Sequence, residues 1–135
     1  MTDNQAAIDM VQRIPAFEQD FTLNHYQDII KATDRPGLES FGADGTTPLW
    51  YYALGLGGES GEFVDKVKKV YRNSQGELDS SATLALAYEL GDVLWYLSRA
   101  AAKLNLTLAQ VAKLNIFKLS DRAKRDVIRG EGDNR

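Results

Sequence analysis

The sequence predicts an all-α protein, an antiparallel bundle of about four to five helices. Apolar residues recur with the spacing of one helix face in two long segments, residues 49–70 and 86–104. Turn and capping residues separate the segments, and no stretch shows the apolar–polar alternation of a half-buried strand. Hydrophobic residues make up 44% of the 135 residues, which suits the core of a single domain spanning residues 1–135.

The first two expected helices lie in the N-terminal third of the chain. Residues 3–13 are expected to form a short helix that ends before Pro15. Thr22 is a typical N-cap for a second helix over residues 23 to about 33, which the Arg-Pro-Gly segment 35–37 ends. Residues 1–20 are interpreted as an N-terminal extension of the domain.

The third helix is expected after a loop over residues 36–47. Thr47 and Pro48 are typical of an N-cap followed by a first-turn proline, so this helix should run from Pro48 to about Arg72. The Asn-Ser-Gln-Gly segment 73–76 is a turn signal that ends it.

Two further helices complete the expected bundle. The fourth should reach residue 103 or 104, and it has three candidate caps at its start, Asp79, Ser80 and Ser81. Asn105 and Thr107 then mark a break and a new cap for a last helix over about 108–127. Residues 129–135 show no periodicity and are expected to form an irregular tail.

Composition excludes several classes of protein. The absence of cysteine excludes disulfides, zinc–thiolate sites and cysteine nucleophiles, and the single histidine, His25, argues against histidine relays. A net charge of -3 argues against general binding to duplex nucleic acid. No secretion signal and no apolar run of membrane-spanning length is visible, so no membrane association and a cytoplasmic location are expected.

Two pairs of carboxylates carry the functional signal. Glu59 and Glu62 form one pair and Glu89 and Asp92 the other, each spaced i, i+3 at the edge of an apolar stripe. Because a short turn joins the two helices, they should pack antiparallel with both pairs along one groove. Four converging carboxylates repel one another unless a cation neutralises them, and oxygen-preferring Mg²⁺ is the ordinary solution. The pattern favours a metal-dependent enzyme acting on phosphate over acids that merely flank a core.

Glycines interrupt the same two helices. A glycine inside a helix costs about 1 kcal/mol relative to alanine, so a group of them needs a reason. Gly61 and Gly91 stand inside the acid pairs, where we expect them to let a neighbouring helix or a ligand approach the backbone. For Gly57 and Gly58, a simple break in the helix is the alternative.

Three sets of polar or aromatic residues each have two possible roles. Lys66 follows Glu62 by four residues and either pairs with it or contacts phosphate. A polar stripe on the last helix is either solvated or holds phosphate oxygens: Asn115, Lys118 and Arg122. Tyr88 and Trp95 lie away from the leucine stripe, so they face either a subunit interface or the N-terminal helices.

These motifs, in this order, resemble those of the MazG-like, all-α nucleoside triphosphate pyrophosphohydrolases. The resemblance extends from about residue 23 to residue 135. Its most specific blocks are residues 53–62 (ALGLGGESGE), 65–69 (DKVKK), 89–96 (ELGDVLWY), 115–122 (NIFKLSDR) and 132–135 (GDNR).

The resemblance implies a helical bundle completed by oligomerisation, as a homodimer or a dimer of dimers. It implies hydrolysis of a nucleoside or deoxynucleoside triphosphate to the monophosphate and pyrophosphate, with Mg²⁺ or Mn²⁺. The metal-binding, catalytic motifs of the family fall on Glu59, Glu62, Glu89 and Asp92. Its phosphate and nucleotide contacts fall on Asn115, Lys118, Arg122, Asp133, Asn134 and Arg135.

One position departs from the family pattern. Many members carry a glutamate directly before the first motif glutamate, where this chain has Gly58. One acid fewer could lower the number of metals or change which carboxylate activates water. This difference is the best support for the alternative hypothesis, a helical module of the same fold that binds a nucleotide or a protein without turnover.

Overall fold

The computed structural model describes residues 21–34 and 47–124, and every regular element in these ranges is a helix. The elements are α2 (Leu23–Ile29), the 3₁₀-helix η1 (Ile30–Thr33), α3 (Leu49–Ser74), α4 (Ser80–Lys103) and α5 (Leu108–Lys124). The all-α prediction is therefore confirmed. The expected helix over residues 3–13 and the tail over residues 129–135 lie outside the described residues.

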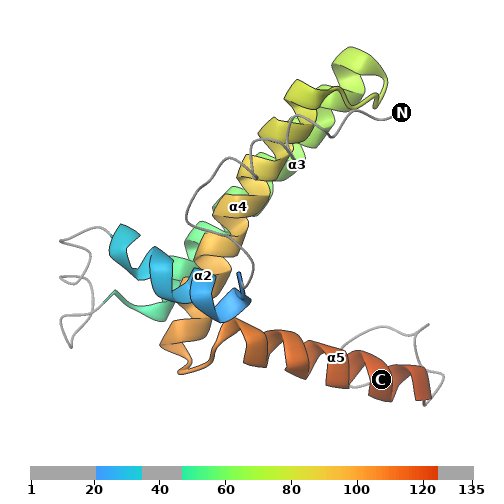
Figure 1. The fold of residues 1–135 in the computed structure, drawn as a ribbon. Coiled ribbons are helices and arrows are strands. Elements are labelled where there is room, and N and C mark those ends of the chain that lie inside the picture. The colour runs from blue at the N-terminus through green and yellow to red at the C-terminus, as the bar shows by residue number, and fades with distance from the viewer. Residues whose placement is uncertain (1–20, 35–46, 125–135) are drawn as a thin grey trace.

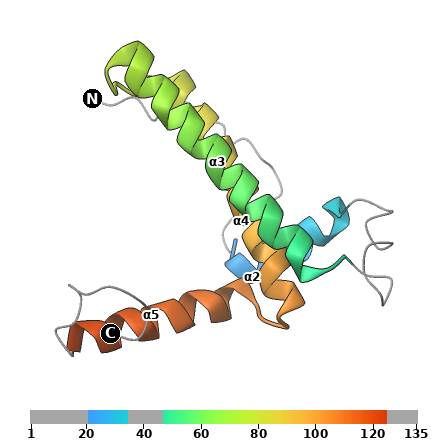
Figure 2. The ribbon, with the colours of Figure 1, turned by 180° about the vertical axis from the view of Figure 1, so that it is seen from behind.

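Helices α3 and α4 form a long antiparallel hairpin (Figure 1). The short α2 and η1 lie across this hairpin near its open end, opposite the turn that joins α3 to α4. Helix α5 leaves the same end and projects away from the hairpin, as the view from behind also shows (Figure 2). No described helix combines the length and hydropathy that crossing a membrane requires.

Local signals end α3 and begin α4, and so define the turn of the hairpin. The side chain of Asp79 accepts a hydrogen bond from the backbone amide of Ala82 at 2.7 Å, so Asp79 is the cap among the three candidates. Gln75 and Gly76 adopt positive φ angles of 54° and 89°, which end α3 and reverse the chain.

The start of α3 differs from the expectation. Pro48 itself occupies the N-cap position, with no side-chain hydrogen bond, and Thr47 is buried one residue earlier. Farther along, α3 continues without interruption through its glycines, so the alternative of a break at Gly57 and Gly58 is wrong.

The close approach of the two arms occurs at a different glycine from those expected. A Cβ atom on Gly55 would overlap the ring of Tyr96, whereas a Cβ atom on Gly61 or Gly91 would meet nothing within 4 Å. No described part of a neighbouring helix therefore approaches Gly61 or Gly91 in the single chain, and the approach of a ligand to them stays a prediction. Gly55 is the residue that lets α3 and α4 approach each other.

The 3₁₀-helix η1 is tied to α4 by polar side chains. Trp95 donates its indole N–H to Thr33 Oγ1 at 2.6 Å, and Arg99 forms an ion pair with Asp34. Of the two alternatives for Trp95, packing against the N-terminal helices is correct. Tyr88 stays 56% exposed in the single chain.

The last helix begins as expected. Asn105 has a positive φ of 58°, and Thr107 and Gln110 exchange two hydrogen bonds of 2.8 and 3.1 Å between side chain and backbone. This reciprocal pair is a capping box, which satisfies two free backbone amides at the helix start.

Candidate metal centre

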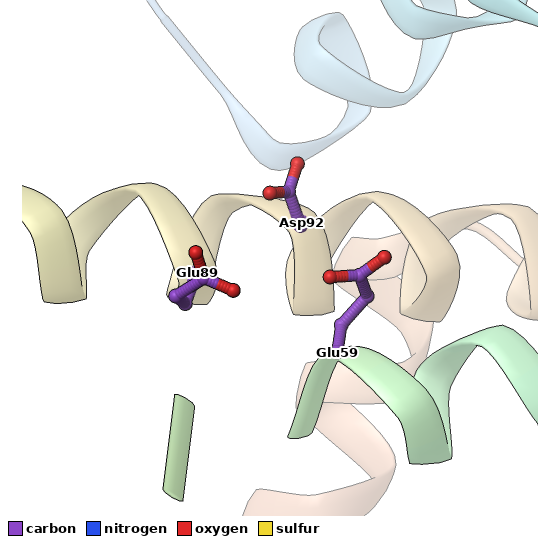
Figure 3. A group of neighbouring side chains, drawn as sticks. All are labelled: Glu59, Glu89 and Asp92. Atoms are coloured by element: carbon purple, nitrogen blue, oxygen red, sulfur yellow. The ribbon is translucent and has the colours of Figure 1, made fainter. Parts of the chain in front are cut away.

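Three carboxylates from the two arms of the hairpin meet at one point (Figure 3). Glu59 extends from α3, and Glu89 and Asp92 lie on successive turns of α4. Each residue places one carboxylate oxygen within 4.8 Å of the corresponding oxygens of the other two. We call these three residues the acidic cluster.

The close contact between the arms explains this convergence. Gly55 lies four residues before Glu59, and Tyr96 lies four residues after Asp92, so each is about one helical turn from the acidic cluster. Because the Tyr96 ring fills the space where a side chain at position 55 would lie, the helices are close together at this level. Carboxylates one turn away can then reach across.

The acidic cluster carries unfavourable interactions that a cation would relieve. Partial burial and the negative charges of Asp92, Glu62 and Glu89 raise the pKa of Glu59. Glu89 is only 7% exposed, and its Oε2 atom is buried with no hydrogen-bond partner among the described residues. A buried oxygen that lacks a donor and a set of mutually repelling carboxylates both fit a hard divalent cation.

Glu62, the fourth carboxylate of the sequence motif, lies outside the acidic cluster. Its side chain is exposed, although its charge contributes to the raised pKa of Glu59. It lines an open pocket of about 400 Å³ on the α3 side, together with Gly58, Gly61, Asp65, Lys66 and Lys69. Three of the four expected carboxylates thus converge, and the fourth lies beside them.

Lys66 pairs with a carboxylate of the opposite arm. Its Nζ lies 2.7 Å from Glu89 Oε1, so among the described residues its partner is Glu89 and not the expected Glu62, and its contact with phosphate stays a prediction. The hydrogen bond to Glu89 raises the pKa of Lys66, which keeps its ammonium charged. One oxygen of Glu89 is thus neutralised and the other is not.

Tyr26 is a site neighbour that the sequence reasoning missed. It belongs to α2, and partial burial together with the negative charge of Asp92 raises the pKa of its hydroxyl. In Figure 3 a pale-blue segment, the colour of the α2 region, passes over Asp92. No spacing rule links residue 26 to residue 92, so only the tertiary arrangement identifies it.

The polar stripe of the last helix is not brought to the acidic cluster of its own chain. Asn115, Lys118 and Arg122 all belong to α5, the helix that projects away from the hairpin (Figures 1 and 2). The remaining expected contacts, Asp133, Asn134 and Arg135, lie outside the described residues.

Fold and side chains together define an all-α protein with a candidate metal centre between two antiparallel helices. The MazG nucleotide pyrophosphohydrolase domain matches residues 51–127, a segment that contains the whole acidic cluster. The "Gene 37 protein" of Mycobacterium phage L5 is 42% identical over 92 residues, which cover 68% of this chain and 81% of that protein. The chain belongs to the MazG nucleotide pyrophosphohydrolase family. No solved structure matches it significantly.

Proposed function

We propose that the protein is a Mg²⁺-dependent nucleoside triphosphate pyrophosphohydrolase. It would cleave a nucleoside or deoxynucleoside triphosphate to the monophosphate and pyrophosphate. The observation that carries this proposal is the convergence of Glu59, Glu89 and Asp92 within 4.8 Å. Family membership supports the nucleotide as the substrate class.

The acidic cluster would hold Mg²⁺, with Mn²⁺ as a substitute, through the oxygens of Glu59, Glu89 and Asp92. A divalent cation bound there supplies charge neutralisation for phosphate oxygens and lowers the pKa of a bound water. Glu89 supplies a ligand that solvent does not reach, and Asp92 supplies one at the exposed edge where substrate can enter.

Glu62 is the proposed proton acceptor. It lies beside the acidic cluster without belonging to it, and it borders the open pocket on α3. The water oxygen forms a bond to the α-phosphorus while the bond from the α-phosphorus to the bridging oxygen breaks. The electron pair leaves with pyrophosphate, and the water proton passes to the carboxylate of Glu62.

The proposed phosphate contacts on α5 require a second copy of the chain. In one chain α5 projects away from the hairpin (Figure 1), so Asn115, Lys118 and Arg122 would serve the site of a neighbouring subunit. Helix α5 also exposes four large apolar residues, at 52 to 74% exposure: Leu114, Ile116, Phe117 and Leu119. These observations support a homodimer or a dimer of dimers, with Asn134 and Arg135 as further proposed nucleotide contacts.

The proposal is tested by identifying products. Purified protein with Mg²⁺ and each common nucleoside or deoxynucleoside triphosphate should yield monophosphate and pyrophosphate, resolved by ³¹P NMR. Asp92→Asn should remove turnover, and Glu62→Gln should lower kcat by about 100-fold or more. Glu77→Gln, which removes an exposed acid at the hairpin turn, is the matched control and should keep full activity. Nucleotide binding without any product would instead identify a non-catalytic binding module.

A further inference from the structure

Within the protein, the ammonium of Lys66 is the counter-ion of Glu89. The Oε1 atom of Glu89 lies 2.7 Å from this ammonium, while its buried Oε2 atom has no hydrogen-bond partner among the described residues. A buried carboxylate without compensation is costly, so the cation-free chain needs this ammonium. Lys66 therefore occupies the charge-neutralising role that a metal ion would take over.

We propose that Lys66 is a positioning residue that neutralises the acidic cluster in the cation-free protein and is released when a divalent cation binds. Its ammonium then turns into the adjoining pocket and binds the phosphate chain of the nucleotide. This inference rests on the proposed function, from which it takes both the cation and the phosphate ligand.

A divalent cation and the ammonium of Lys66 would compete for the carboxylate of Glu89. Oxygen ligands lie about 2.1 Å from a bound Mg²⁺, so a cation held by Glu89 would be a near neighbour of the ammonium on the same group. Two positive charges at such a separation repel strongly, because a partly buried site screens them less than bulk water does. Binding of the divalent cation should therefore weaken the pair between Lys66 and Glu89.

Lys66 borders an open pocket that can accept its ammonium. Its side chain is 38% exposed and lines the open pocket that also contains Gly58, Gly61 and Glu62. A lysine side chain is a flexible four-carbon stem, so the ammonium of Lys66 can leave Glu89 without a change in the backbone of α3. Gly58 and Gly61 contribute no side chains to the pocket wall, so they leave space for the ammonium of Lys66.

The other lysines near the pocket are bound differently. Lys68 and Lys69 both pair with Asp65, and their hydrogen bonds lower the pKa of that carboxyl to about 2. Neither contacts the acidic cluster in these pairs, so a cation there does not compete for them. Of these three lysines, only Lys66 would therefore change position when a divalent cation binds.

A titration with Mn²⁺ tests the competition directly. Isothermal titration calorimetry is carried out without nucleotide on the wild type, on Lys66→Met and on Lys68→Met as the matched control. Loss of the competing ammonium should tighten Mn²⁺ binding by about tenfold in Lys66→Met, within the usual range of coupling between sites. Lys68→Met removes the same charge from the same helix and should stay within about twofold of the wild type.

A second measurement needs no variant and so does not depend on how Lys66→Met folds. Full-length protein is acetylated briefly with an amine-reactive ester, with and without Mg²⁺, and each lysine is quantified by mass spectrometry. Mg²⁺ should raise the reactivity of Lys66 several-fold and leave that of Lys68 unchanged.

The outcomes separate this inference from the proposed function. Wild-type binding of Mn²⁺ with no tightening in Lys66→Met and no gain in Lys66 reactivity would overturn the inference while the metal site stands. Absence of Mn²⁺ binding by all three proteins would overturn both. Binding by Lys66→Met alone would also overturn the inference, since the ammonium would then exclude the cation from the wild-type site instead of being released by it.

Discussion

The side-chain oxygen of Gln27 accepts a hydrogen bond from the backbone amide of Leu108 at 3.0 Å, although 81 residues separate them. The amide nitrogen of the same buried side chain donates to the carbonyl oxygens of Ser98 and Leu106, at 3.3 and 3.1 Å. One residue of α2 thereby joins the end of α4, the connecting loop and the first turn of α5. The direction in which α5 leaves the hairpin depends on this junction.

Gln27→Ala should therefore destabilise the fold by about 2–3 kcal/mol, because it leaves buried backbone groups without partners. Chemical denaturation followed by circular dichroism measures the loss. Asn24→Ala is the matched control: within the described part of the chain, Asn24 Oδ1 accepts a single exposed hydrogen bond of 3.3 Å, from the amide of Ala109. Its cost should stay below about 1 kcal/mol, and equal costs for both variants would contradict the role given to Gln27.

Substitutions of two glycines in α3 should have opposite effects. Gly55→Ala forces a methyl group against the Tyr96 ring and should cost about 1–3 kcal/mol, whereas Gly57→Ala meets open space and should gain about 1 kcal/mol. Gly55→Ala should also separate the arms at the level of the acidic cluster and weaken Mn²⁺ binding. Thermal denaturation and Mn²⁺ titration measure both effects, and a neutral Gly55→Ala would show that the close approach of the arms is dispensable.

Glu59→Gln should stabilise the metal-free protein near pH 7.5 by a few tenths to about 1 kcal/mol. The folded state raises the pKa of Glu59, so the charged form is destabilising in the folded state. The penalty is absent below the unfolded-state pKa, near pH 4, and develops as pH rises through the raised folded-state pKa. The difference in Tm between variant and wild type should therefore grow from pH 4 to pH 7.5.

Mg²⁺ should reverse that order, because only the wild type retains the full acidic cluster and gains stability from a bound cation. A variant that is less stable than the wild type in metal-free buffer would contradict the repulsion described for Glu59. Glu77→Gln, at the far turn of the hairpin, controls for the loss of one negative charge.

Phe117→Glu should shift the protein toward monomer. Phe117 is 74% exposed on the projecting helix α5, and a group of large exposed apolar side chains on one helix is typical of an interaction surface. Sedimentation velocity measures the shift, and Lys113→Glu on the same helix is the control for added negative charge. A wild-type protein that sediments as a monomer would contradict the proposed assembly.

The ends of the helices could be predicted from the sequence because their signals are local. Thr22 accepts a hydrogen bond from the amide of His25, and Asp79 from that of Ala82, each three residues away. Such bonds depend only on residue type and separation along the chain. Pro48 shows the limit of this reasoning, since Thr47 is buried instead of capping α3.

The candidate site could be predicted only in part, because helical spacing does not fix how a helix is rotated against its neighbour. Residues three apart lie about 60° from each other around the axis, so a pair can straddle the edge of a contact. Glu59 faces α4 and Glu62 borders the pocket, although the spacing treats them alike. The partner of Lys66 and the position of Tyr26 depend on contacts between separate helices. Residue spacing within one helix does not predict such contacts.

Anomalous diffraction from crystals soaked in Mn²⁺ is the most direct test of the central claim that the acidic cluster holds a divalent cation. We predict an anomalous peak within bonding distance of carboxylate oxygens of Glu59, Glu89 and Asp92, with Lys66 Nζ no longer in contact with Glu89. An ordered hairpin with all three carboxylates in place and no peak between them, at saturating Mn²⁺, would contradict the claim.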